Sequence, residues 1–228
     1  MLRNISFHLL FVFTIASLLY LGFWQLDRLL WKTELLDNIK NQQNEKPIPF
    51  PFFENSNTHD FKRSEITGVF IPDTEMYFFR SNLKGESGFS VLTALQTKLS
   101  KIVYIDIGWI PFKEKDLKNI EIIKDKNEFL LKGVLIFSKQ NNVFSPENDY
   151  KKNIWYTMNT EVINNYHNFD AGSYILKLVD QKYSQDTLIE FSSTQMPNNH
   201  LEYSITWFSM SFVISMLYFY QIYQIVRK

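Results

Sequence analysis

The chain has no cysteine among its 228 residues. Without thiols it forms no disulfides, carries no haem attached through a C-x-x-C-H motif, and builds no thiolate zinc site or cysteine-based copper shuttle. Thioethers also bind cuprous copper, but Met76, Met158 and Met196 are scattered along the chain rather than paired. The composition therefore argues against a copper chaperone.

Charge is almost absent from both ends of the chain. All 24 acidic residues lie between two apolar stretches, 5–24 and 203–225, in which His8 is the only Asp, Glu, Lys, Arg or His. A helix needs about 20 residues to span a hydrocarbon core roughly 30 Å thick. Because the edge N–H and C=O groups of an open sheet would lack partners in lipid, we predict that both stretches are transmembrane helices.

The charges that flank the two stretches predict their orientation. Outside the stretches the ends carry only the basic residues Arg3, Arg227 and Lys228, whereas the segment just before the second stretch is acidic. The positive-inside rule then keeps the C-terminus in the cytoplasm, and two spans return the N-terminus to the same side. Arg28 and Lys32, just after the first stretch, favour the opposite orientation more weakly.

The expected organisation has three segments: a transmembrane helix over 5–24, an extracytoplasmic (periplasmic) domain over 25–202, and a second transmembrane helix over 203–225. A cleaved signal peptide is the alternative for the first stretch, but no A-x-A-like site occurs over residues 16–25. No room for an amphipathic transit peptide precedes Ile5. We therefore expect the bacterial cell inner membrane as the location.

The central segment is predicted to be rich in short strands. Apolar spacing over 25–43 predicts that the first span continues as an amphipathic helix, and 160–168 is predicted to be a short helix capped by Asn159 or Thr160. The β-rich, turn-bounded runs are 64–70, 75–81, 89–96, 101–110, 129–137 and 173–180. The fold class is thus a membrane α+β protein, with two terminal transmembrane helices flanking a mainly antiparallel β domain, a sheet or small barrel, with a few short helices.

The common motifs of enzymes are missing from the sequence. It has no H-E-x-x-H, G-x-x-x-x-G-K-[ST] or G-x-G-x-x-G. The sequence GESGF over 85–89 resembles part of a nucleophile elbow, but its second glycine comes one residue too early. Glu147 and Asp149 are expected to be solvated rather than to act as a general acid–base pair. We therefore predict that the chain is not an enzyme, with a membrane-tethered hydrolase as the disfavoured alternative. Because the central segment is slightly acidic, we also expect no binding to nucleic acid.

Four histidines are candidates for metal or cofactor binding: His8, His59, His167 and His200. His8 and His200 are expected at opposite faces of the membrane, separated by roughly 24 Å at 1.5 Å per helical residue, so they do not share a metal ion. His59 and His167 lie in polar surroundings and are expected to be solvated surface residues.

His200 differs because it lies immediately before the second span. Trp24 and Gln25 leave the first span at the same level as Tyr203 and Trp207 enter the second. One interpretation is an aromatic belt at the membrane interface, with His200 as a polar residue at the helix entrance. The other is a shared pocket in which one imidazole and a ring of aromatics hold a flat, lipophilic cofactor.

Five sequence blocks occur in an order that is typical of one family. They are LGFWQLDR over 21–28, GFSVLT over 88–93, GWIP over 108–111, FSPEND over 144–149 and NNHLEYSITWF over 198–208. Together they resemble the Surfeit locus protein 1 family over nearly the whole chain. The first and last blocks are specific when they are found together at opposite ends.

The resemblance implies an assembly factor for haem-copper terminal oxidases such as cytochrome c oxidase. The implied partners are the oxidase catalytic subunit I, other assembly factors and membrane lipid, and the implied cargo is haem a, held transiently. The resemblance makes His200 the iron ligand, and the pocket interpretation adds Trp24, Gln25, Tyr203 and Trp207 around it. The alternative is a membrane-anchored scaffold that docks the oxidase subunit without binding haem.

One departure from the family pattern concerns a cation. The family often has Asn-Arg before Gly-Trp, whereas this chain has Asp106 and Ile107. An arginine there is suited to pairing a haem propionate or a partner carboxylate. We expect Arg28 or Arg80 to take its place in this chain, and Arg28 is therefore included among the cofactor-binding candidates.

Overall fold

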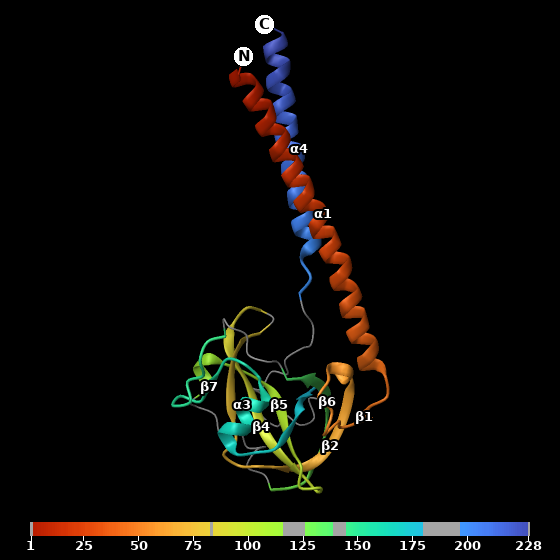
Figure 1. Cartoon of the computed structure of the whole chain (residues 1–228), viewed down its shortest axis with the longest axis vertical. Helices are drawn as coiled ribbons and strands as arrows, with labels where there is room; N and C mark the ends of the chain where they lie inside the picture. Colours follow the sequence, from red (N-terminus) through yellow and green to blue (C-terminus); the bar gives the residue numbers. More distant parts are fainter. Residues whose placement is uncertain (1, 83, 116–125, 139–144, 180–196, 228) are drawn as a thin grey trace. The chain divides into compact units, whose positions relative to one another are not determined.

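The computed structural model describes residues 2–82, 84–115, 126–138, 145–179 and 197–227 (Figure 1). By its internal contacts the chain divides into two compact units. Unit 1 is Met1–Asn38 with Met196–Lys228, and unit 2 is Ile39–Gln195.

Unit 1 is an antiparallel pair of helices, α4 (His200–Val226) and the part of α1 (Leu2–Asn44) up to Asn38. Both helices are long and apolar enough to cross a membrane. They lie side by side with the two chain ends at the same end of the pair (Figure 1). The predicted continuation of the first span is confirmed, because α1 is unbroken until shortly before Pro47, whose ring is incompatible with a helix interior.

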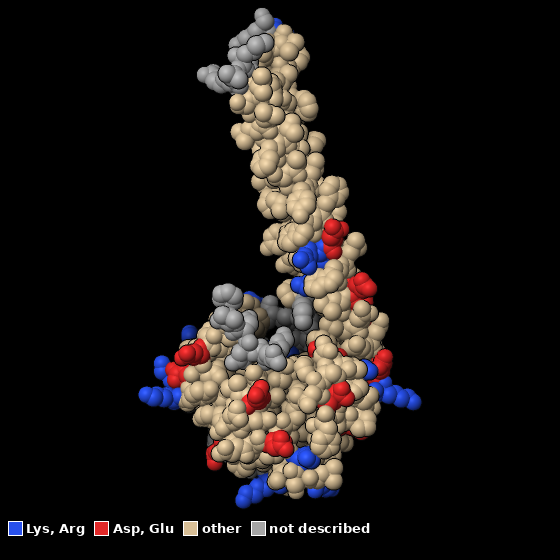
Figure 2. Space-filling view, in the orientation of Figure 1, with Lys and Arg blue, Asp and Glu red and all other residues tan. Residues whose placement is uncertain are grey.

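The helices of unit 1 carry their charges at the ends. Figure 2 shows that the visible face of the pair is free of Lys, Arg, Asp and Glu over most of its length. This agrees with the absence of these residues from 5–24 and 203–225. The pair thus presents an apolar outer surface of the kind that faces lipid.

Small residues allow the two helices to approach closely. Gly22 of α1 is buried, and a Cβ atom added to it would lie 2.6 Å from Cε1 of Phe208 on α4. Ser204, also buried, donates a hydrogen bond from its Oγ to the Gly22 carbonyl oxygen at 3.2 Å. Glycine and serine at such a seam let two backbones pack together, as is typical of helix pairs in membranes.

The other end of the helix pair is held by aromatic rings. Phe11 stacks on Tyr218 with ring centroids 3.6 Å apart and an interplanar angle of 4°. The Tyr218 hydroxyl forms a hydrogen bond of 2.6 Å with Nδ1 of His8. His8 therefore has a partner of its own, far along α1 from Gln25.

Unit 2 is a β-barrel with short helices. Its strands are β1 (Ile48–Pro49), β2 (Arg63–Phe70), β3 (Met76–Ser81), β4 (Ser87–Thr97), β5 (Ile102–Pro111), β6 (Phe129–Phe137), β7 (Ile154–Trp155) and β8 (Ala171–Leu178). Its helices are the 3₁₀ turns Asn57–His59 and Phe112–Glu114 and the α-helix α3 (Thr160–His167). Each of the six predicted β-runs contains a strand, and residue 180, at the end of the last run, lies outside the described residues.

The strands form one sheet in the order β1-β2-β6-β8-β5-β4-β3-β7, and a further pairing of β2 with β4 closes a ring. The ring consists of β2, β4, β5, β8 and β6. Its pairings are antiparallel except β5 with β8, which is parallel. This Greek-key connectivity is that of OB-type barrels. The expectation of a mainly antiparallel sheet or small barrel is confirmed, whereas the connectivity alone does not identify a function.

Two hydrophobic clusters bury the strands. The first fills the barrel and includes Phe89, Ile105 and Leu135. The second packs residues such as Tyr104 and Trp155 on the outer side of the barrel wall, where α3 and β7 cover it. The sequence alternation over 102–107 thus separates two cores rather than a core from solvent, and β4 and β5 are buried on both faces.

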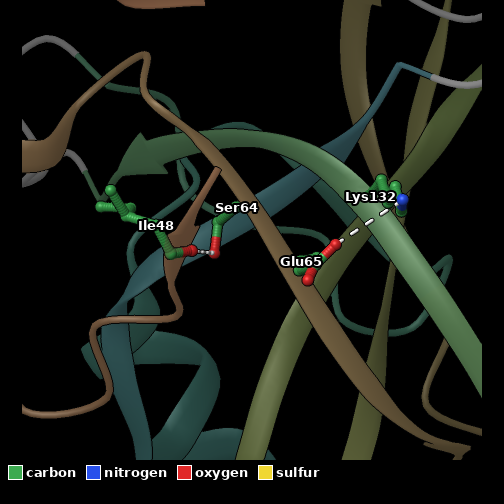
Figure 3. Close-up of polar contacts among 4 residues, drawn as sticks. All are labelled: Ile48, Ser64, Glu65 and Lys132. Atoms are coloured by element: carbon green, nitrogen blue, oxygen red, sulfur yellow. Dashed lines mark hydrogen bonds and ion pairs between the residues drawn. The ribbon is translucent and has the colours of Figure 1, made fainter. Parts of the chain in front are cut away.

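The short strand β1 joins the barrel through β2. The Oγ of Ser64 donates to the Ile48 carbonyl oxygen at 2.9 Å, and Glu65 pairs with Lys132 on β6 at 3.7 Å (Figure 3). Asn159 caps the N-terminus of α3 by accepting hydrogen bonds from two backbone N–H groups. This is one of the two predicted caps.

His59 and His167 are not the solvated surface residues that the sequence suggested. Both are half-buried, and within the described ranges His59 Nδ1 and His167 Nε2 are buried without a hydrogen-bond partner. His167 ends α3 and stacks on Phe169 with ring centroids 5.4 Å apart. Burial lowers the pKa of the His167 imidazole, because the charged form loses hydration.

The first prediction tests the helix seam. Replacing Gly22 with leucine places a side chain where Phe208 already lies, so we expect α1 and α4 to separate. Because the chain has no cysteine, disulfide formation between Phe11→Cys and Tyr218→Cys measures helix pairing without background. We expect Gly22→Leu to reduce this cross-link strongly. Ala16→Leu, at an exposed position of α1, is the matched control and should leave it intact.

The second prediction concerns pH. The folded chain binds a proton at His167 less readily than the unfolded chain, so its free energy of unfolding should fall as the pH drops below about 6.5, the ordinary histidine pKa. His167→Phe keeps the stacked ring but does not titrate. Urea unfolding in detergent, followed by near-UV circular dichroism between pH 8 and pH 5, should show a shallower loss of stability for His167→Phe. Identical slopes for the two proteins would contradict the assignment.

Candidate interfacial histidine site

His200 is the first residue of α4, and its ring lies against α1. Its Nδ1 is 2.7 Å from the side-chain oxygen Oε1 of Gln25, and both side chains are half-buried. An amide oxygen only accepts, so Nδ1 must donate its proton to Gln25. In the neutral imidazole, Nε2 then carries the free lone pair, which is the arrangement that a metal-binding histidine needs.

The segment that leads into α4 is also held on α1. Nζ of Lys32 donates to the Pro197 carbonyl oxygen at 2.6 Å, and Nδ2 of Asn198 donates to Oγ1 of Thr33 at 3.3 Å. These two contacts lie two helical turns along α1 from Gln25, on the same side of that helix. The segment before His200 is thus fixed on α1, in addition to the contact of His200 itself with Gln25.

Two of the predicted aromatic residues share a stripe of α4 with His200. Tyr203 and Trp207 follow His200 at spacings of three and seven residues, which places them on one side of the helix. The Tyr203 side chain is 56% exposed, whereas Trp207 is half-buried. The stripe offers aromatic surface next to the imidazole.

Arg28 and Trp24 belong to a different stripe of α1. The Arg28 guanidinium lies 5.6 Å from the ring centroid of Trp24 and 5.5 Å from that of Trp31. Arg28 is exposed and, among the described residues, forms no ion pair. Its two contacts are cation–π interactions with rings four residues before it and three residues after it, about two helical turns apart.

The structure therefore brings together some of the predicted site residues and not others. It joins His200 to Gln25, and Arg28 to Trp24. Within the described part of the chain, no ring contact connects Trp24 with Tyr203 or Trp207. The predicted residues line two neighbouring faces of the helix pair instead of a single closed ring.

Several residues that shape the site were not predicted from the sequence. Gly22, Asn198 and Ser204 stand in the resembling blocks, but no role was assigned to them, and Thr33 was not identified at all. A small residue on each apolar stretch is the signal for a close helix seam. Nothing in the sequence pairs Thr33 with Asn198, because they are distant in the chain.

Asp106 and Ile107 stand where the family often has Asn-Arg, and both are buried in the barrel domain. Ile107 is 3% exposed and lies in the barrel core. Asp106 is buried, and its Oδ1 accepts hydrogen bonds from Oγ of Ser90 at 2.8 Å and from the Gly108 backbone N–H at 3.1 Å. These donors stabilise the carboxylate inside the domain.

One cation near Asp106 is Lys177, and Arg80 lies within electrostatic range of Lys177. Lys177 is the register partner of Asp106 on β8, and burial lowers the pKa of the Lys177 ammonium, while Asp106 raises it and Arg80 lowers it. The Arg80 side chain is exposed at the end of β3. Arg28 and Arg80 lie in different units. Of the two, only Arg28 belongs to the unit that contains His200.

The histidine site contains a single imidazole. Across the described ranges, no group of three or more His, Asp or Glu side chains is placed to hold a metal ion. Such an arrangement suits a metal that arrives within its own planar ligand and needs one axial nitrogen from the protein. The donor set of His200, with aromatic surface beside it, fits a haem.

Comparison with known proteins assigns the chain to a family. The model of the SURF1 family matches residues 12–212. A SURF1-like protein of Rickettsia prowazekii is 30% identical, over 94% of this chain and 88% of the relative, and one of Rickettsia conorii is 28% identical, over 92% and 88%. Surfeit locus protein 1 of Rattus norvegicus is 22% identical over 91% of this chain and 73% of its own length. With the family model covering most of its length, from one apolar helix to the other, this chain belongs to the SURF1 family.

Proposed function

We propose that this chain is an assembly factor for a haem-copper terminal oxidase that binds haem a through His200 and helps to insert it into the catalytic subunit. The observation that carries the proposal is the hydrogen bond from His200 Nδ1 to Gln25. It leaves Nε2 free and aimed by a second residue, which is how proteins prepare a histidine for a metal.

The residues of the helix pair have distinct roles in this proposal. Gln25 fixes the tautomer and orientation of His200, and Tyr203 and Trp207 provide aromatic surface along the same stripe. Haem a, when bound, supplies the iron and a flat apolar face with a long isoprenoid tail. Arg28 is a cation of the helix pair that is available to a carboxylate, because its cation–π contacts are with the rings of Trp24 and Trp31.

A carrier must also release what it binds. One imidazole, at the end of a helix and only half-buried, holds a haem less firmly than two axial ligands in a closed pocket. In the proposal, this chain delivers haem a to subunit I of the oxidase and acts together with other assembly factors. We take these partners from the resemblance to the Surfeit locus protein 1 family, and the half-buried position of His200 is compatible with transfer.

We propose the bacterial inner membrane as the location, with both termini in the cytoplasm and the barrel in the periplasm. Two observations support this: the chain has two helices that are long and apolar enough to span, and it is similar to proteins of the bacterium Rickettsia. The basic ends of the chain favour the cytoplasmic side.

The third prediction tests the iron ligand. The chain, produced in cells that make haem a and purified in detergent, should show a Soret band. His200→Ala should lose the band, and Gln25→Leu should weaken haem affinity by about 10- to 100-fold, as loss of a residue that orients a metal ligand does. His8→Ala, which removes the imidazole at the other end of the helix pair, is the control and should retain it.

The same experiment distinguishes a haem a carrier from a scaffold that docks the oxidase subunit without binding haem. If the chain is a scaffold only, the wild-type protein shows no Soret band even where haem a is abundant, although its deletion lowers oxidase activity. A haem content that is unchanged in His200→Ala would refute the ligand assignment.

The fourth prediction concerns topology. Leu201 and Val226 lie at opposite ends of α4, and both side chains are exposed. In a chain without native cysteine, Leu201→Cys should react with a membrane-impermeant maleimide added outside spheroplasts, and Val226→Cys should react only after lysis. Labelling in the reverse order would place the barrel in the cytoplasm and overturn the proposed location.

A further inference from the structure

Asn198 contains a hydrogen-bond acceptor that the structure leaves unused. This residue lies two positions before His200, and its Nδ2 donates to Oγ1 of Thr33 at 3.3 Å. Its side-chain oxygen Oδ1 is buried and, among the described residues, has no hydrogen-bond partner. Buried polar atoms without partners are uncommon in folded proteins and call for a specific explanation.

The orientation of the Asn198 amide follows from its neighbours. The Thr33 hydroxyl donates its only proton to the Leu29 carbonyl oxygen at 2.8 Å. Oγ1 of Thr33 can therefore only accept from Asn198, so the amide nitrogen must face it. The unused group is then the oxygen, and the partner that it lacks is a donor.

The location of this acceptor relates it to the proposed haem site. Asn198 is held by Thr33 and His200 is held by Gln25. Because Asn198 precedes His200 by two residues, their Cα atoms are at most about 7 Å apart. The acceptor thus lies toward the edge of a planar ligand centred on His200. A donor that meets it belongs to a peripheral substituent rather than to the iron.

We propose that Oδ1 of Asn198 accepts a hydrogen bond from a hydroxyl group at the edge of the haem, and thereby selects hydroxylated haem a over haem b. This inference rests on the proposed function. Haem a carries a hydroxyl on the carbon that joins its isoprenoid tail to the ring, where haem b has a vinyl group. Other peripheral groups of haem a offer no comparable neutral donor, since its formyl oxygen only accepts.

The selectivity has a physical reason. A site with a buried group that hydrogen-bonds a ligand hydroxyl discriminates against the analogue that lacks it, because the buried group is then left unpaired. Without Asn198 the apolar tail still favours haem a, but the contribution of the hydroxyl disappears. The effect of Asn198 is therefore a difference between the two haems, not a change in general affinity.

The experiment titrates the detergent-purified full-length chain with haem a and, separately, with haem b, following the Soret band. We expect Asn198→Leu, of similar size but without an acceptor, to weaken haem a binding by roughly tenfold and to leave haem b binding unchanged or slightly tighter. Asn199→Leu is the matched control, because the neighbouring Asn199 is exposed and its side chain makes no cap hydrogen bond. It should change neither affinity.

The outcomes distinguish this inference from the proposed function. Retained haem b binding shows that Asn198→Leu is folded. Equal weakening of both haems would make Asn198 a structural residue and overturn the inference alone, as would no change in either. Absence of haem binding in the wild-type chain overturns the proposed function and this inference together.

Discussion

The arrangement of this protein's candidate site depends on the close approach of α1 and α4 at Gly22. The glycine leaves room for Phe208 and exposes its carbonyl oxygen to Ser204. One turn before Ser204 on α4, this approach brings His200 within hydrogen-bonding distance of Gln25. A larger residue at position 22 would push the helices apart and free the imidazole to rotate.

The hydrophobic clusters of the chain lie in unit 2, whereas the candidate site lies in unit 1. The barrel of unit 2 has two hydrophobic clusters and strands buried on both faces, so it holds its own fold. Unit 1 instead has an apolar outer surface and a few polar contacts concentrated at the His200 end of the helix pair. Polar groups in a span or at its end are costly unless they are paired, and they therefore tend to mark function. Asn198, with its unused acceptor, is the exception that the proposed cargo explains.

Much of the fold follows from local sequence patterns. Apolar length predicts the two helices, and alternation bounded by turns predicts the six long strands, because both patterns act through neighbouring residues. The parallel pairing of β5 with β8 and the closure of β2 onto β4 were not predicted, since strand partners are chosen by contacts between distant segments. The burial of His59 and His167 was missed for the same reason.

The sequence by itself determined where the apolar helices lie, that the domain between them is rich in strands, and that His200 stands at the start of the second helix. It also identified Gln25 and Arg28 as candidates. Only the tertiary structure decided that Gln25 holds His200 while Arg28 turns toward Trp24 and Trp31, and that Thr33 orients Asn198. Gln25 and Arg28 are three residues apart and point about 60° apart around the helix axis. Which of them meets a partner on α4 depends on how the second helix packs against the first.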